Sequence, residues 1–179
     1  YNIYLGDCAG KYANGDYNVA IGGESLLGSS TLANNTGGCN VAIGRQAAKC
    51  MESGTNNILL GCKVGYGLTN VSENILIGND AGSASTNDNA YCYNIGIGHS
   101  AVRSLEKGIK NVVVGGGALF RNDCAFCNTI IGYEAVGDSD CSSWGGKIND
   151  NVIIGHRAGY KLSATSAGSS SQQNVLIGH

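Results

Sequence analysis

The chain has 179 residues, with 29 glycines, no proline and only 13% charged residues. It is too apolar, at 42%, and too weakly charged for a disordered tract, and it lacks the three-residue glycine period and the proline of collagen. A net charge of −2 gives no electrostatic basis for binding nucleic acid. No apolar run reaches the ~18 residues of a membrane helix. We therefore expect a compact all-β chain with no nucleic-acid partner and no membrane insertion.

A five-residue motif, Asn–apolar–any–apolar–Gly, dominates the sequence. Its ten copies begin at Asn2, Asn18, Asn40, Asn57, Asn74, Asn94, Asn111, Asn128, Asn151 and Asn174. The intervals between them are 16, 22, 17, 17, 20, 17, 17, 23 and 23 residues. We number the positions of each repeat from this Asn as zero, so the glycine stands at +4. The motif predicts one repetitive segment over residues 1–179.

Each motif has the pattern of a short strand. Positions +1 and +3 are Ile, Val or Leu in every copy except at Thr129, and alternating β-branched residues that end at a glycine favour a strand. The glycine at +4 predicts a corner, through a positive φ or a close backbone approach. Position +7 is mostly Ala, which indicates an inward position between closely spaced walls.

Such short strands are stable only when copies stack side by side. A minimum period of 16 to 17 residues fits one coil of two short strands and two turns. Ten coils at ~4.8 Å each predict a rod of roughly 45–50 Å, with a ladder of asparagine side chains at position zero. The predicted fold is a parallel β-solenoid or β-roll.

We expect the apolar residues at +1 and +3 to point into the coil. The side chain at +2 lies between them on the strand, so the sequence predicts that it points out of the coil. No charged residue occurs in this column. An exposed apolar stripe of this length needs a cover, either a loop or strand of the same chain or other copies of the chain. The short coils leave few residues for a loop, so we expect an oligomer interface. Its predicted residues are Leu59, Leu76, Val113, Ile130, Ile153 and Leu176.

The sequences Asn-Val-Ala-Ile-Gly at 18–22 and 40–44 and Gly-Asn-Asp-Ala-Gly at 78–82 resemble the head repeats of trimeric autotransporter adhesins. They are also similar to repeats in tail-fibre-like proteins of phages and large viruses. The resemblance implies a left-handed parallel β-roll in which three chains pack through the Asn-to-Gly strands, and a surface-displayed fibre that mediates attachment. The irregular intervals and the eight cysteines depart from autotransporter heads and favour the viral-fibre or another secreted-fibre branch. The expected location is extracellular, on a cell or virion surface.

The longer intervals insert residues at one corner of the coil, where repeat proteins often bind ligands. The inserts are 27–39, 83–93, 137–150 and 160–173. Trp144 and Tyr91 are the candidate loop residues for contacting a host surface glycan or receptor. The alternative is that the inserts are tolerated surface decoration.

Cys124 and Cys141 both stand at +13 of consecutive repeats, so stacking predicts a disulfide between them. A redox or zinc function of the Cys-X-X-Cys pair at 124–127 is disfavoured, because no βαβ pattern or second ligand pair accompanies it. Asn34 and Asn70 lie in Asn-X-Ser/Thr sequons and are possible glycosylation sites.

The sequence favours a structural fibre or adhesin segment that attaches through its corner loops, with itself as partner in a homotrimer. The alternative is a subunit of an end-to-end extracellular filament. Because the repeat runs from residue 2 to Gly178, we expect either a piece of a longer fibre or coils that stack between subunits. No enzyme activity, metal or cofactor is expected, because the repeats lack the six-residue period of β-helix acyltransferases and contain no Ser/His/Asp set. An ice-binding surface would need a regular exposed Thr column, which is absent from the sequence.

Overall fold

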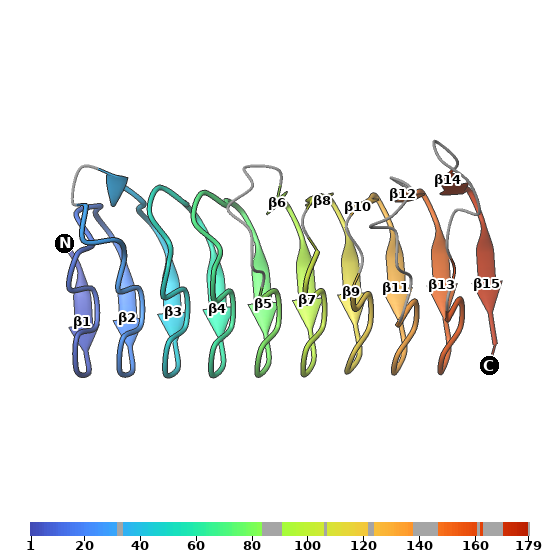
Figure 1. The fold of residues 1–179 in the computed structure, drawn as a ribbon, viewed down its shortest axis with the longest axis horizontal. Helices are drawn as coiled ribbons and strands as arrows, with labels where there is room; N and C mark the ends of the chain where they lie inside the picture. The colour runs from blue at the N-terminus through green and yellow to red at the C-terminus, as the bar shows by residue number, and fades with distance from the viewer. Residues whose placement is uncertain are drawn as a thin grey trace.

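The computed structural model of the chain describes residues 1–31, 34–83, 91–105, 107–121, 124–137, 147–160, 162 and 170–178. These residues form a rod of stacked coils (Figure 1). One strand per repeat, at positions +1 to +3, joins a ten-stranded parallel sheet. Its strands are β1 (Ile3–Leu5), β2 (Val19–Ile21), β3 (Val41–Ile43), β4 (Ile58–Leu60), β5 (Ile75–Ile77), β7 (Ile95–Ile97), β9 (Val112–Val114), β11 (Thr129–Ile131), β13 (Val152–Ile154) and β15 (Val175–Ile177).

A second parallel sheet forms from residues just before the motif in the later coils. It is ordered β14-β12-β10-β8-β6. Its strands are β6 (Tyr91–Cys92), β8 (Lys107–Ile109), β10 (Cys124–Phe126), β12 (Lys147–Asn149) and β14 (Ser170–Gln172). The predicted parallel β-solenoid of about ten coils is therefore confirmed.

Both sheets pair like positions of successive repeats. Leu59 lies opposite Leu76, for example, and Ile130 lies opposite Ile153. Each repeat position thus becomes a column along the rod. Ten strands spaced by ~4.8 Å give the larger sheet a length of about 43 Å.

The asparagine ladder at position zero holds this register. The backbone N–H and the Nδ2 of Asn57 both donate to Oδ1 of Asn40, over 3.0 and 2.9 Å. Asn57 Nδ2 also donates to the carbonyl oxygen of Val71, three residues before the next ladder asparagine, over 2.8 Å. The same pattern recurs along the rod, and the asparagines of the internal coils are buried. Since a buried amide is costly unless its polar groups are bonded, the ladder opposes any slip in register.

The corner glycines meet both conditions that the sequence left open. Gly61 has a φ of +142°, and a Cβ there would lie 2.4 Å from the carbonyl oxygen of Gly78 in the next coil. The corners at −1, +6 and +8 also use left-handed backbone, often without glycine, as at Lys63 and Lys110. Such residues cost about 1 kcal/mol each. Coil-to-coil bonds, such as Lys63 N–H to the Arg45 carbonyl at 2.9 Å, hold them in place.

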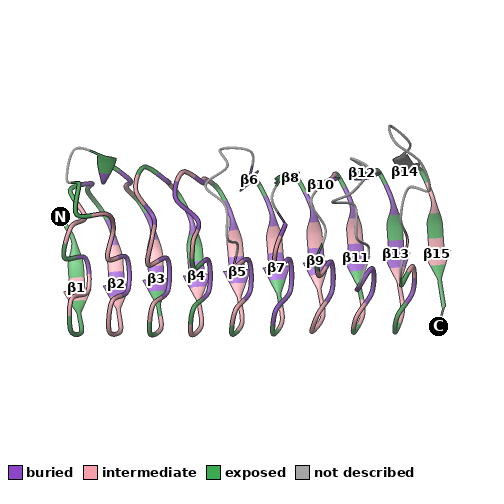
Figure 2. Ribbon diagram, in the orientation of Figure 1, coloured by how far each residue is buried: buried purple, intermediate pink, exposed green. Residues whose placement is uncertain are grey.

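The predicted direction of position +2 is wrong. Each internal strand of the ten-stranded sheet has its buried residue in the middle (Figure 2). Leu59, Leu76, Val113, Ile130 and Ile153 are 0% exposed in the core of their own chain, and Leu176 packs partly buried against that core. Because alternate residues of a strand face the same side, the inward asparagine at zero places +2 inside as well. These six side chains therefore do not form an oligomer interface.

The ladder can be tested by replacing one of its members. Asn57→Ala removes donors to Asn40 and Val71 and the acceptor of the Asn74 N–H. Leaving buried groups unbonded costs roughly 1–3 kcal/mol, which we expect as a fall in the unfolding free energy in urea. Asn79→Ala is the matched control, because the amide of Asn79 is exposed and makes one bond of 3.3 Å. An equal fall in both variants would contradict a stabilising role for the ladder.

Candidate functional site

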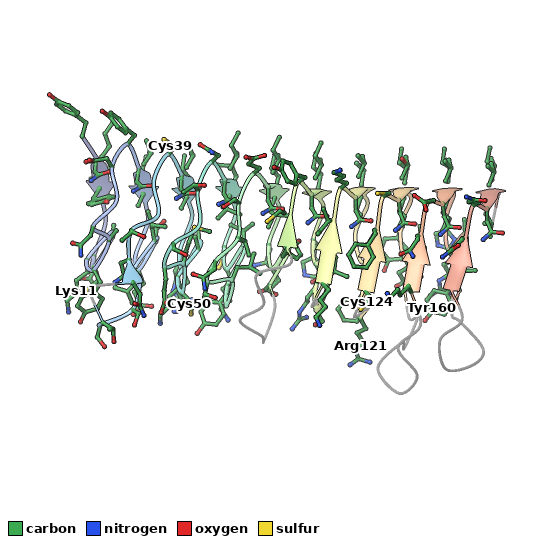
Figure 3. All side chains as sticks on the ribbon, turned by 90° about the horizontal axis from the view of Figure 1, so that it is seen from above. Lys11, Cys39, Cys50, Arg121, Cys124 and Tyr160 are labelled. Carbon is green, nitrogen blue, oxygen red and sulfur yellow. The ribbon has the colours of Figure 1, made fainter. Side chains whose placement is uncertain are left out.

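The outer face of the ten-stranded sheet is a long apolar surface. Side chains at +1 and +3 project from it, and nineteen of these twenty residues are Ile, Val or Leu. Figure 3 shows them standing in rows along one side of the rod. Even in the middle of the rod, Ile43 and Ile97 are 38% and 37% exposed. We call these two columns the outer apolar strip.

The strip is long and narrow, and an exposed column of mixed polarity borders it. Ten strands of three residues give it about 43 Å by about 10 Å, or roughly 400 Å², close to the largest apolar patch of a typical monomer. The −1 column forms this border and is exposed at each described coil, with Asn, Glu, Lys, Asp or Gln in five coils and Tyr or Cys in the other five. An apolar centre with a more polar rim is the anatomy of a protein interface.

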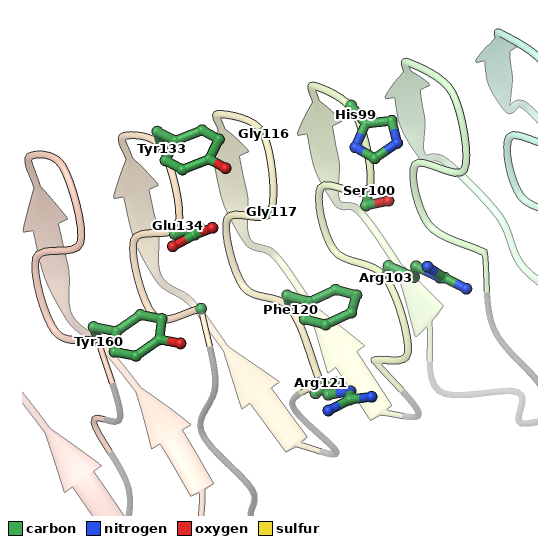
Figure 4. Close-up of a pocket in the computed structure, with 11 residues that line it drawn as sticks. His99, Ser100, Arg103, Gly116, Gly117, Phe120, Arg121, Tyr133, Glu134 and Tyr160 are labelled. Carbon is green, nitrogen blue, oxygen red and sulfur yellow. The ribbon is translucent and has the colours of Figure 1, made fainter.

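A second feature, a depression of about 470 Å³, lies over the later coils (Figure 4). We call it the aromatic–arginine pocket. Its walls come from positions +5, +6, +9 and +10 of neighbouring repeats. It is lined by His99, Ser100, Arg103, Gly116, Gly117, Phe120, Arg121, Tyr133, Glu134, Gly137 and Tyr160.

Two adjacent glycines open this pocket. Gly116 and Gly117 occupy +5 and +6 of their coil, where the neighbouring coils carry His99 and Ser100 on one side and Tyr133 with Glu134 on the other. A Cβ at Gly116 would touch the Tyr133 ring at an ordinary 3.5 Å, so a larger residue would fit there and fill the space. The hollow therefore results from missing side chains and not from a break in the coil.

One wall of the pocket is held by an ion pair. Both Nε and Nη2 of Arg157 lie 2.7 Å from Oε2 of Glu134. Arg157 holds the pKa of the Glu134 carboxyl below its ordinary value, and a hydrogen bond to Glu134 raises the pKa of Tyr133. The Arg157 guanidinium lies 5.3 Å from the centre of the Tyr160 ring. Glu134 is thus ionised, and its charge is paired with that of Arg157. Tyr133 and Tyr160 lie beside this ion pair.

The opposite wall is positively charged. The guanidiniums of Arg103 and Arg121 lie 5.8 and 5.3 Å from the centre of the Phe120 ring. Within the described ranges neither guanidinium has a carboxylate within salt-bridge distance. Their N–H groups are available to an acceptor that enters the pocket.

The candidate loop residues have different outcomes. Tyr91 is 1% exposed, in β6, so the prediction that it contacts a ligand is wrong. Its position three residues before Asn94 places it on the inward side of the five-stranded sheet. Trp144 lies outside the described residues, and its predicted role stays a prediction.

The predicted disulfide also remains open. Cys124 lies half-buried in β10, whereas Cys141 lies outside the described residues. The described cysteines form no disulfide with one another. Of the two sequon asparagines, Asn34 is exposed, and Asn70 is half-buried with its Oδ1 accepting a bond of 2.6 Å from Ser53.

Sequence reasoning missed the aromatic–arginine pocket because it searched the inserted loops. The pocket is built from residues about 17 positions apart that stacking brings together. A signal was present in the columns: Phe120 and Tyr160 share position +9, and two glycines interrupt +5 and +6 between them.

Comparisons with protein-family models, with curated proteins and with solved structures found no match to this chain. In the described part of the chain, no helix is long and apolar enough to cross a membrane. The function is therefore inferred from the outer apolar strip and the aromatic–arginine pocket.

Burial of Tyr91 predicts a pH dependence of stability. Burial raises the pKa of its phenol, so above about pH 10 the unfolded chain loses this proton while the folded chain keeps it. The unfolding free energy should therefore fall as the pH rises past this point, and Tyr91→Phe should reduce that fall. At pH 7 the substitution should leave stability unchanged or raise it, because it removes a buried hydroxyl that no described residue bonds. Urea unfolding at both pH values measures this, and an identical alkaline loss in both proteins would contradict it.

Proposed function

We propose that this chain is a structural segment of a surface-displayed fibre, in which three copies pack coaxially through the outer apolar strip. The observation that carries the proposal is that strip, which no described part of the chain covers. A continuous apolar sheet face that runs along every coil is a surface on which another chain can pack, and its continuity, rather than its area, favours a partner.

A second copy of the same chain is the partner that fits the strip best. Any occupant must present apolar side chains at the ~4.8 Å rise of the coils over about 43 Å. Another copy carries the same columns at the same rise and has no charge in them. Pairing of like surfaces is also the usual way in which soluble chains assemble.

Three copies agree with the shape of the strip and with the resemblance noted in the sequence. The strip is about 10 Å wide, and its borders are more polar than its centre, so three strips that converge on one axis bury their apolar centres and leave the borders in water. The Asn-to-Gly strand remains the element that we expect at the interface. The side chains are those at +1 and +3, and not those at +2.

Attachment is the second part of the proposal. Arg121 and Tyr160 lie on the side of the rod away from the outward rows of the ten-stranded sheet (Figure 3). In a coaxial trimer this side faces outward and is free to meet a glycan or receptor on a host surface. Such a fibre would act outside the cell or on a virion.

The assembly can be tested with two charges in the strip. Ile43→Asp with Ile97→Asp places them where the side chains are 38% and 37% exposed, so the coil should still fold. We expect light scattering to give the mass of three chains for the native protein and of one chain for the variant. Far-UV circular dichroism should be unchanged.

Tyr66→Asp is the matched control, because Tyr66 is similarly exposed, at 36%, and lies outside the strip. It should keep the native mass. A native monomer, or a variant that keeps the mass of three chains, would overturn the coaxial trimer. A very large and polydisperse species that survives the strip substitutions would favour the end-to-end filament.

A further inference from the structure

We infer that the aromatic–arginine pocket binds an acidic sugar, with the sugar's carboxylate or sulfate on Arg103 and Arg121 and its ring against the aromatic side chains. The use of this site for attachment depends on the proposed fibre function, whereas binding itself is a property of one chain.

The charge of the pocket favours an anion. Arg103 and Arg121 bring two positive charges to the rim, and Phe120 between them holds each guanidinium by its face. Among the described lining residues Glu134 is the only carboxylate, and Arg157 pairs with its charge from outside the pocket. Planar guanidiniums bind carboxylate and sulfate oxygens through paired N–H donors.

The shape of the pocket favours a ring that is apolar on its faces and polar at its edge. Tyr133 and Tyr160 line the pocket with aromatic surface, Phe120 contacts the two guanidiniums, and His99 and Ser100 supply hydrogen-bonding groups. The volume of about 470 Å³ lies within the range of small-ligand sites. Pyranose rings have this mixed character, with C–H groups on the faces and hydroxyl groups around the rim.

The pocket is accessible in the proposed assembly. It is open to solvent, and its residues Arg121 and Tyr160 lie on the side of the rod away from the outer apolar strip (Figure 3). The Glu134–Arg157 pair links two successive coils and fixes the wall beside Tyr133 and Tyr160 before any ligand enters. A site held in place in this way loses less conformational freedom on binding.

A nucleotide also combines a ring with an anion, but the arrangement of the aromatic groups disfavours it. Figure 4 shows Phe120, Tyr133 and Tyr160 at separate places around the depression and not as two faces of one slot. A nucleobase gains most from stacking on a parallel ring. We therefore make nucleotide binding an outcome of the test.

Isothermal titration calorimetry on the native protein tests the site with four probes: sialyllactose, a sulfated heparin disaccharide, lactose and adenosine monophosphate. We expect at least one acidic sugar to bind about tenfold or more tightly than lactose, and to weaken as salt is added. The sialylated and sulfated probes separate the two sources of the anion. Equal binding of lactose, or tighter binding of the nucleotide, would overturn the inference.

Two glycine variants locate the binding site. Gly116→Leu fills the hollow, and Gly23→Leu is its matched control at the same +5 position, where the nearest atom to a new Cβ is 4.0 Å away. Neither glycine has a positive φ, so both variants should fold. We expect Gly116→Leu to lower the affinity for the acidic sugar about tenfold or more and Gly23→Leu to leave it unchanged. Unchanged affinity in Gly116→Leu would place any binding elsewhere.

The arginines are tested by Arg103→Gln with Arg121→Gln, which should remove the preference for acidic over neutral sugar. Light scattering on each sample separates the two proposals. A native monomer that binds the acidic sugar keeps this inference and refutes the trimer. A trimer that binds none of the sugars refutes the inference and keeps the fibre.

Discussion

The buried asparagine at the start of each coil is the constraint from which the remaining features of this molecule follow. Its Oδ1 accepts hydrogen bonds from two N–H groups of the next asparagine. Its Nδ2 donates to a backbone carbonyl just before that next asparagine, as at Val71. A slip of one residue would leave these groups unbonded in an apolar core. The motif can therefore recur at intervals of 16 to 23 residues without losing its register, because the ladder aligns the coils and the extra residues lie elsewhere.

The coils, the parallel pairing and the inward alanine column could be predicted because each rests on a pattern repeated along the chain. The facing of the strand could not be read from hydrophobicity, because the outer columns of this sheet are as apolar as the inner one. Leu59 and Leu76 show the consequence: placed outside by their neighbours' apolarity, they lie in the core. The asparagine at position zero is the residue that indicates the direction, because its hydrogen bonds form inside the coil. Its inward side chain decides which alternate residues of the strand also face inward.

The aromatic–arginine pocket was harder to predict, for a different physical reason. The motif shows where a single coil departs from the pattern. A pocket, however, is lined by residues of several neighbouring coils. Gly116 and Phe120 belong to one repeat, whereas Tyr133 and Tyr160 come from the two that follow. Tyr91 was chosen for its place in a long interval, yet the coil turns it inward. A column-by-column comparison of neighbouring coils is the better search in a solenoid.

In the proposed trimer, the outer apolar strip and the corner of the coil face different physical demands. A partner chain that lies along the rod must match every coil, so a single charge in the outer columns would interrupt the whole contact, and +1 and +3 contain none. The corner just after the motif glycine has no such requirement, and there the +5 column holds Asp7, Arg45, His99, Gly116 and Tyr133 in different coils. A local group of side chains from three or four coils can therefore form the proposed sugar site while the strip continues unchanged along the rod.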